Sequence, residues 1–171
     1  MKESDSTRKH KSSASKKIVF QIIVVSTGVS KGEREDRSGP LIRKIIEEAG
    51  YEVSGINIIP DDSKAIASSV RTAEEIADAI ILTGGTGLTS TDITIEAIRP
   101  LLRKEISAFQ TLFTTYSNNE VGPSCMLSRA MAGLINRSII FAIPGSPQAC
   151  ELALKQIIIP EVAHISKHAK E

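Results

Sequence analysis

Short apolar runs rich in β-branched residues constrain the fold of this chain more than any other feature. The run from Ile18 to Val25 is interrupted only by Gln21, so it lacks the polar alternation of a half-exposed strand. Such runs are typical of strands buried on both faces, as in parallel sheets. Comparable runs at 79–83 and 138–143 predict two further buried strands, and the more polar run at 51–59 predicts a strand nearer the edge.

Segments with apolar residues on one helical face separate these strands. The predicted helices cover 38–49, 66–77, 93–101, 105–116, 124–135 and 148–168, and the predicted loops cover 26–37 and 117–123. Pro40 suits a first helical turn and Gly50 a helix end, whereas Pro100 and Pro160 should bend or break their helices. Strands that alternate with helices predict a three-layer α/β fold, with a doubly wound, mostly parallel sheet covered on both faces.

Length and composition suit one globular domain preceded by a basic tail. The chain has 171 residues, of which 41% are hydrophobic and 24% charged. Residues 1–17 hold six Lys or Arg and two Asp or Glu, which leaves the rest of the chain slightly acidic. We therefore predict a disordered tail over 1–17 and one domain over 18–171. No aromatic residue interleaves the basic ones, so we expect no nucleic-acid partner.

Nothing in the sequence points to a membrane or to secretion. No apolar run approaches the roughly 20 residues that span a bilayer, and the charged N-terminus lacks the apolar core of a signal peptide. Cys125 and Cys150 have no metal-type spacing and read as small buried hydrophobic residues. We expect a cytoplasmic protein with reduced cysteines and no membrane partner.

A glycine-rich turn follows the third predicted strand. It reads Thr83-Gly84-Gly85-Thr86-Gly87, and a periodic apolar segment begins after Asp92. Glycine permits positive φ and lets a ligand approach the backbone closely. The unpaired N–H groups of a helix that starts near Asp92 would face the same space, which favours an anion such as phosphate.

The predicted sheet brings this turn together with three others. Ligands of such sheets bind beyond the carboxyl ends of the strands. Polar or glycine-bearing turns follow each predicted strand there, at 26–28, 60–62, 83–92 and 144–147. The four turns therefore predict a single pocket. Hydroxyl groups for a polar ligand would come from Ser26, Thr27, Thr83, Thr86, Thr89, Ser90 and Ser146, although hydroxyls are also common in plain turns.

Two aspartates in these turns have two alternative interpretations. Asp61 and Asp92 both precede helical segments, where aspartate is a favoured N-cap. Two carboxylates beside a phosphate site could instead hold Mg²⁺, which prefers one or two carboxylates together with phosphate oxygens and water. The second interpretation explains better why both acids fall at the edge of the sheet that binds ligands.

Standard phosphate motifs are absent. No Gly-Lys-Ser/Thr of a P-loop occurs, and the segment 85–90 only approximates the dinucleotide fingerprint and follows the wrong strand. Arg129 falls in a predicted helix; it could pair with a phosphate, but a surface arginine is the preferred interpretation. His10, His164 and His168 have no acid or nucleophile at a telling spacing, so we assign them no catalytic role.

A set of short motifs is spread along the chain. They are Asp36 and Ser38-Gly39 in the first loop, then Thr83 to Gly87, Asp92, Glu96-Ala97, Pro100-Leu101, Glu105, Phe109, Ser128-Arg129-Ala130, Ala132-Gly133 and Pro144-Gly145-Ser146. With these motifs the chain resembles, from Ile18 to its C-terminus, the MoaB and MogA family of molybdenum cofactor biosynthesis proteins. The combination is highly specific, although the glycine turn alone is not. After the first strand the chain departs from the family, with Ser26-Thr27-Gly28 in place of Ser-Asp-Arg or Ser-Asn-Arg.

The resemblance implies a molybdopterin-binding fold and a nucleotidyltransferase activity. Active members use MgATP to adenylylate molybdopterin, form homotrimers or homohexamers, and pass the product to other molybdenum cofactor enzymes. The family's two essential acids fall on Asp61 and Asp92, which would be the catalytic and metal-binding residues. The substrate-binding residues would be Ser26, Thr83, Gly84, Gly85, Thr86, Gly87, Ser128, Pro144, Gly145 and Ser146, with Ser26, Ser128 and Ser146 at the pterin end.

Two other functions remain open from the sequence. The pocket could bind or carry molybdopterin without any chemistry, as some family members do. The domain could also serve as an oligomeric scaffold, as the related domain of gephyrin suggests. Neither the choice between molybdenum and tungsten nor that between trimer and hexamer follows from the residues.

Overall fold

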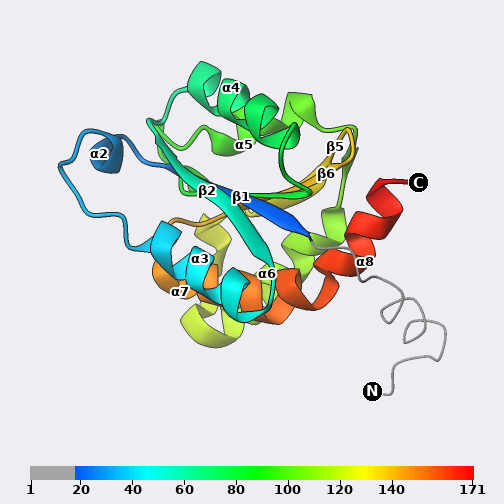
Figure 1. Cartoon of the computed structure of the whole chain (residues 1–171). Helices are drawn as coiled ribbons and strands as arrows, with labels where there is room; N and C mark the ends of the chain where they lie inside the picture. Colours follow the sequence, from blue (N-terminus) through cyan, green and yellow to red (C-terminus); the bar gives the residue numbers. More distant parts are fainter. Residues whose placement is uncertain (1–17) are drawn as a thin grey trace.

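A six-stranded sheet forms the middle layer of the protein (Figure 1). The computed structural model describes residues 18–171, so the predicted tail at 1–17 lies outside the described residues. The strands are β1 (Val19–Val25), β2 (Glu52–Ile59), β3 (Ala79–Thr83), β4 (Lys104–Glu105), β5 (Met131–Ile135) and β6 (Ser138–Ile143). Their order in the sheet is β2-β1-β3-β6-β5-β4, and the first four strands in this order, β2, β1, β3 and β6, run parallel. The predicted mostly parallel sheet is confirmed, as is the edge position of β2.

Helices cover both faces of the sheet, as the alternating pattern predicts. Their bounds are α2 (Thr27–Ser30), α3 (Ser38–Glu48), α4 (Ser63–Glu74), α5 (Thr94–Ile98), α6 (Ser107–Val121), α7 (Pro147–Ala153) and α8 (Ile159–Ala169). One apolar core lies between the sheet and α3, α6, α7 and α8, and a second lies between the sheet and α4 and α5. The three-layer α/β architecture follows.

The predicted helix at 124–135 is wrong. The segment Gly122–Leu127 is a 3₁₀ turn, and the apolar residues that follow form β5, which pairs antiparallel with β6. A two-residue hairpin joins these strands, with Asn136 at φ +46, and asparagine is one of the few residues that favour this conformation. The Ala, Met and Leu of β5 favour helix in isolation, but pairing with β6 overrides that preference. The two-residue strand β4 pairs with β5 and was also not predicted.

Smaller differences occur at loops and prolines. The predicted loop 26–37 contains the short helix α2, and α6 extends to Val121 into the second predicted loop. A 3₁₀ turn at Arg99–Leu101 ends α5, as Pro100 suggests. The chain stays helical through Pro160, because a π-helical segment, Leu154–Ile158, widens the helix just before it.

None of the helices formed by residues 18–171 combines the length and the apolar composition that a bilayer crossing requires.

Candidate functional site

Two adjoining pockets lie at the carboxyl ends of the parallel strands. The first, which we name the Asp61 pocket, has a volume of about 480 Å³, and the second, the Ser128 pocket, about 300 Å³. The predicted residues that line the Asp61 pocket are Ser26, Asp61, Thr83, Gly84, Gly85, Asp92 and Gly145. Those that line the Ser128 pocket are Gly85, Thr86, Gly87, Asp92, Ser128, Pro144, Gly145 and Ser146. Because Gly85, Asp92 and Gly145 line both, they form the boundary between the pockets.

The turn at 84–87 requires glycine, both for its backbone angles and because a side chain would collide with neighbouring atoms. Gly84 and Gly85 have φ of +102 and +63, in the left-handed region that disfavours other residues. The structure places Asp61 and Asp92 against this turn: a Cβ on Gly85 would lie 3.3 Å from Oδ1 of Asp61, and one on Gly87 would lie 2.7 Å from Oδ2 of Asp92. The two carboxylates therefore approach the same turn, at two of its glycines.

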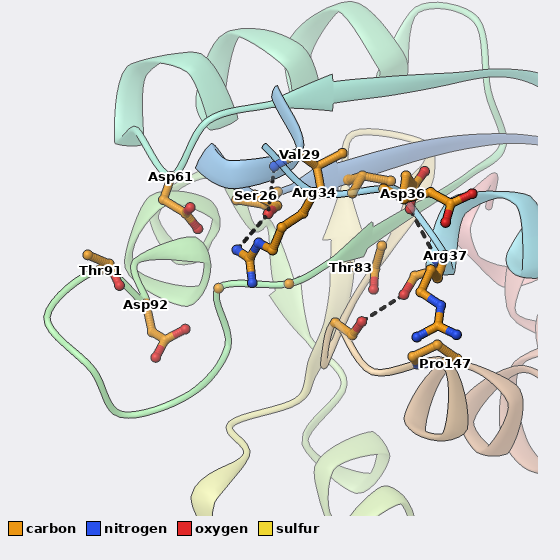
Figure 2. Close-up of a pocket in the computed structure, with 17 residues that line it drawn as sticks. Ser26, Val29, Arg34, Asp36, Arg37, Asp61, Thr83, Thr91, Asp92 and Pro147 are labelled. Carbon is orange, nitrogen blue, oxygen red and sulfur yellow. Dashed lines mark hydrogen bonds between the residues drawn. The ribbon is translucent and has the colours of Figure 1, made fainter. Parts of the chain in front are cut away.

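Each aspartate is held by a threonine in the same way. Thr27 donates both its N–H and its hydroxyl to Oδ2 of Asp61, each at 2.8 Å. Thr89 donates its N–H at 2.8 Å and its hydroxyl at 2.6 Å to Oδ2 of Asp92. These threonine bonds use one oxygen of each carboxylate and leave both Oδ1 atoms out. Figure 2 shows the two aspartates on the same side of the Asp61 pocket.

Neither aspartate is the N-cap of the helix that follows it, although Asp61 accepts the N–H of Thr27, the first residue of α2. The cap of α4 is the next residue, Asp62, whose Oδ1 accepts the N–H of Ala65 at 2.8 Å. The cap position of α5 is Ile93, which makes no side-chain capping bond. Capping of the following helix, which the sequence left open for both residues, therefore does not explain why Asp61 and Asp92 are acids.

The local hydrogen bonds keep Asp92 ionised. Partial burial acts to raise its pKa, but the hydroxyl and N–H of Thr89, the N–H of Gly87 and the charge of Arg129 together outweigh burial, so the pKa lies below its ordinary value of 3.8. At a pH above this pKa the Asp92 carboxylate is ionised and can bind a cation.

Replacing Thr89→Val is expected to raise the pKa of Asp92, because valine removes the hydroxyl bond and retains the backbone bond. A depressed pKa stabilises the fold above the pKa of the unfolded chain, and that contribution is lost as the pH falls through the folded pKa. The variant should thus be less stable than wild type near neutral pH, and the difference should close in acid. Carboxyl ¹³C NMR measures the pKa, and denaturant unfolding at several pH values measures the stability.

The control for this experiment is Thr72→Val, whose hydroxyl donates to the Ser68 carbonyl within α4. It should leave the Asp92 pKa where it is. An unchanged Asp92 pKa in Thr89→Val would contradict the assigned role of the hydroxyl.

Arg129 braces the glycine turn, which corrects its interpretation as a helical surface residue. It lies between the 3₁₀ turn and β5, with Nε donating to the Gly87 carbonyl at 2.8 Å and Nη2 to the Asp92 carbonyl at 2.9 Å. Its N–H also donates to the Thr86 carbonyl at 3.0 Å. A hydrogen bond from Arg129 is the main cause that lowers the pKa of Glu96, with which it forms an ion pair. Arg129 thus fixes the segment that carries Asp92.

The predicted donors differ in whether they are free to bind a ligand. The Gly84 N–H donates to the Ile143 carbonyl at 3.0 Å, so Gly84 supplies conformation rather than a donor. The Thr83 hydroxyl donates to the Pro144 carbonyl at 3.0 Å. The N–H groups of Gly85 and Thr86 form no hydrogen bond with residues 18–171 and therefore remain available.

The three serines expected to share the pterin end are divided between the two pockets. Ser26 lines the Asp61 pocket and caps α2, whereas Ser146 lines the Ser128 pocket and caps α7 through the Ala149 N–H at 3.3 Å. Ser128 has a buried hydroxyl that finds no hydrogen-bond partner among residues 18–171. A buried polar atom without a partner is costly, so the Ser128 hydroxyl is the one best explained by a ligand.

Two arginines that no sequence pattern indicated lie in the site. Arg34 and Arg37 line the Asp61 pocket from the segment between α2 and α3 (Figure 2). Asp36 holds this segment by accepting the N–H groups of Ser38 and Gly39 at 3.1 and 2.9 Å, and the Ser38 hydroxyl donates to the Gly145 carbonyl at 2.7 Å. The segment is a polar loop without apolar periodicity, so its sequence does not indicate which charged side chains face the pocket.

The two aspartates fit a Mg²⁺ ion whose other ligands come from its surroundings. Both are carboxylates on one pocket, with an oxygen each outside the threonine bonds. Within residues 18–171 no group of three or more His, Cys, Asp or Glu side chains could hold a metal. Such a site suits Mg²⁺, which commonly takes one or two carboxylates and completes its shell with phosphate oxygens and water.

Known proteins resemble this chain in sequence and in structure. The family described as "Probable molybdopterin binding domain" matches residues 21–164. A molybdenum cofactor biosynthesis protein B of Bacillus cereus is 40% identical over 164 residues, which cover 94% of this chain and 96% of the relative. A molybdopterin adenylyltransferase of Pyrococcus furiosus is 43% identical over 167 residues, covering 95% and 97% of the two chains. The crystal structure of the tungsten cofactor synthesizing protein MoaB from Pyrococcus furiosus superposes with a TM-score of 0.86 at 43% identity, covering 91% of this chain and 99% of that one.

The fold and the glycine-lined site thus define a molybdopterin-binding α/β domain. The chain belongs to the MoaB/MogA family of these domains, whose relatives are named for molybdenum and tungsten cofactor biosynthesis.

Proposed function

We propose that this protein adenylylates molybdopterin at the boundary between the two pockets. The observation that carries the proposal is the pair Asp61 and Asp92, which line one cavity, lie against one glycine turn and do not cap the helices that follow them. Similarity to the Pyrococcus furiosus molybdopterin adenylyltransferase at 43% identity supports it. The domain that does this comprises residues 18–171.

The two pockets suit a reaction between two phosphorylated substrates. In the proposed reaction the terminal phosphate oxygen of molybdopterin attacks the α-phosphorus of ATP. A new P–O–P bond forms, the bond to the β-phosphate breaks, and pyrophosphate leaves. Gly85 and Asp92 line both pockets, so the reacting phosphates would meet there, with the Gly85 and Thr86 N–H groups as donors. Such reactions depend on positioning and on electrostatic stabilisation.

The bound Mg²⁺ would neutralise phosphate charge, and the chain's part is to hold two carboxylates in place for it. Thr27 and Thr89 fix the Oδ2 atoms, and Arg129 fixes the backbone at Asp92. The orphaned Ser128 hydroxyl would donate to the substrate in the Ser128 pocket.

The direct test is to incubate the full chain with ATP, Mg²⁺ and molybdopterin. Adenylyl-molybdopterin and pyrophosphate should appear in equal amounts, and neither should form when ATP or the metal is omitted. Tight binding of molybdopterin with no ATP turnover would contradict the transferase and select a binding or carrier function.

We also propose that the chain assembles into a homotrimer or homohexamer. Large apolar side chains on α6 and the following 3₁₀ turn support this, because Leu112, Met126 and Leu127 are 45%, 75% and 62% exposed, and exposed apolar clusters commonly mark interfaces. Light scattering of the full chain should give three or six times its mass of 18.4 kDa. A monomeric mass would contradict the proposal.

A further inference from the structure

We propose that Arg34 is a phosphate-binding residue of the Asp61 pocket, and that position 28 is glycine because a side chain there would exclude Arg34. The proposal rests on the proposed function only in taking the ligands of the pocket to be phosphorylated. Arg34 belongs neither to the glycine turn nor to the aspartate pair; it reaches the pocket from the segment between α2 and α3.

The backbone directs Arg34 toward the pocket. The segment after α2 turns back at Gly32, which has φ +73. The N–H groups of Glu33 and Arg34 then both donate to the Gly28 carbonyl, at 2.9 and 3.1 Å. Two bonds to one carbonyl fix where the Arg34 side chain begins, so its direction follows from the fold of the segment.

The Arg34 side chain lies over Gly28, in the space that a side chain at that position would need. A Cβ on Gly28 would lie 2.6 Å from Nε of Arg34 and 2.9 Å from Nη2. Real Cβ atoms do not approach other heavy atoms so closely, and packed atoms in contact are about 3.5–4.0 Å apart. Gly28 is buried and has no positive φ that would otherwise require glycine.

The guanidinium group is left with few partners. Its one hydrogen bond within the described part of the chain is from Nη2 to Oγ of Ser26, at 3.4 Å. The ion pairs among residues 18–171 do not include Arg34. Figure 2 shows the side chain extending past Ser26 into the Asp61 pocket. Most of the five donors of this group are therefore free to bind a ligand.

Phosphate is the ligand chemistry that fits these donors. The guanidinium fork matches two phosphate oxygens, and a charge-assisted contact of this kind is short and strong. The pocket also contains the carboxylates of Asp61 and Asp92, so a free anion would be repelled unless cations offset them. Arg34 supplies such a cation. The phosphate could belong to ATP or to molybdopterin, and the experiment distinguishes the two.

Arg34→Ala is expected to weaken binding of one phosphorylated substrate by roughly tenfold to a hundredfold, the usual value of a charge-assisted hydrogen bond. Calorimetry with ATP and Mg²⁺, and separately with molybdopterin, identifies which one. Arg34→Lys should restore part of the affinity, because lysine keeps the charge and loses the fork. Lys31→Ala is the matched control: it removes a cation from the same segment at a residue that does not line the pocket.

Gly28→Ala tests the packing half of the proposal. The added methyl should displace the flexible Arg34 side chain without unfolding the chain, and it should reproduce the loss of affinity seen in Arg34→Ala. In a chain that already carries Arg34→Ala, the same change should have no further effect on affinity. Equal and additive losses would show that Gly28 acts independently of Arg34 and would overturn this half of the proposal.

The binding measurements separate this proposal from the proposed function, because they require no turnover. Unchanged affinity for both substrates in Arg34→Ala, with adenylyl transfer intact in wild type, overturns the role of Arg34 and leaves the transferase standing. Weakened affinity in Arg34→Ala, with no adenylyl transfer in wild type, supports Arg34 and overturns the transferase.

Discussion

Asp61→Asn and Asp92→Asn are each expected to lower adenylyl transfer by about a hundredfold to a thousandfold, the range seen when one preorganised electrostatic contact to a transition state is removed. Asparagine keeps the shape of the side chain and can still accept from Thr27 or Thr89, so the fold should persist. What is lost is negative charge beside the glycine turn, which Asp61 approaches at Gly85 and Asp92 at Gly87. Initial rates of pyrophosphate release at several Mg²⁺ concentrations measure the effect.

Asp62→Asn is the matched control, because it makes the same change one residue along. Asp62 caps α4 and does not line the Asp61 pocket, and asparagine is an equally good cap. Its activity and stability should match wild type. Equal activity in Asp61→Asn and Asp62→Asn would contradict the metal role of Asp61.

Gly84→Ala is expected to destabilise the fold by about 2–5 kcal/mol, which adds backbone strain to a steric clash. The residue has φ +102, and a Cβ there would collide with the carbonyl oxygen of Val25. That oxygen belongs to β1 in the middle of the parallel sheet, so it cannot move aside as a flexible side chain can. Denaturant unfolding measures the loss.

Gly50→Ala separates strain from clash. Gly50 has φ +85 and would have nothing within 4 Å of a Cβ, so the substitution should cost about 1–2 kcal/mol, from the backbone alone. If both variants lose the same stability, the clash with Val25 contributes nothing, and the tight approach of the glycine turn to β1 would be contradicted.

The parallel part of the sheet could be predicted because its signal is local. The apolar runs that became β1, β3 and β6 are long enough to exclude half-exposed strands, and the turns after them fall on one edge by topology alone. The antiparallel strand β5 could not be predicted, because its five residues, Met, Ala, Gly, Leu and Ile, show no alternation of apolar and polar side chains. Asn136 in its hairpin was the available signal.

Some residues of the site could likewise be predicted from the sequence, and others could not. Asp61 and Asp92 could be singled out because each is an acid in a turn that the topology brings to one edge. The sequence could not show whether they cap helices. The choice between Asp61 and Asp62 as the cap of α4 depends on the backbone angles where that helix starts. Thr27 and Thr89 could be named only as hydroxyls for a ligand, and Arg34 was missed. What these side chains bind depends on how two loops fold back, which no periodic pattern records.

The central claim is that Asp61 and Asp92 share one divalent cation beside the glycine turn. A crystal of the full chain grown with Mn²⁺ and a non-hydrolysable ATP analogue tests it most directly, because Mn²⁺ gives an anomalous signal. The account predicts one peak within coordination distance of both carboxylates, with nucleotide phosphates against Gly85 and Thr86. Nucleotide bound elsewhere, or a peak that neither aspartate contacts, would contradict it.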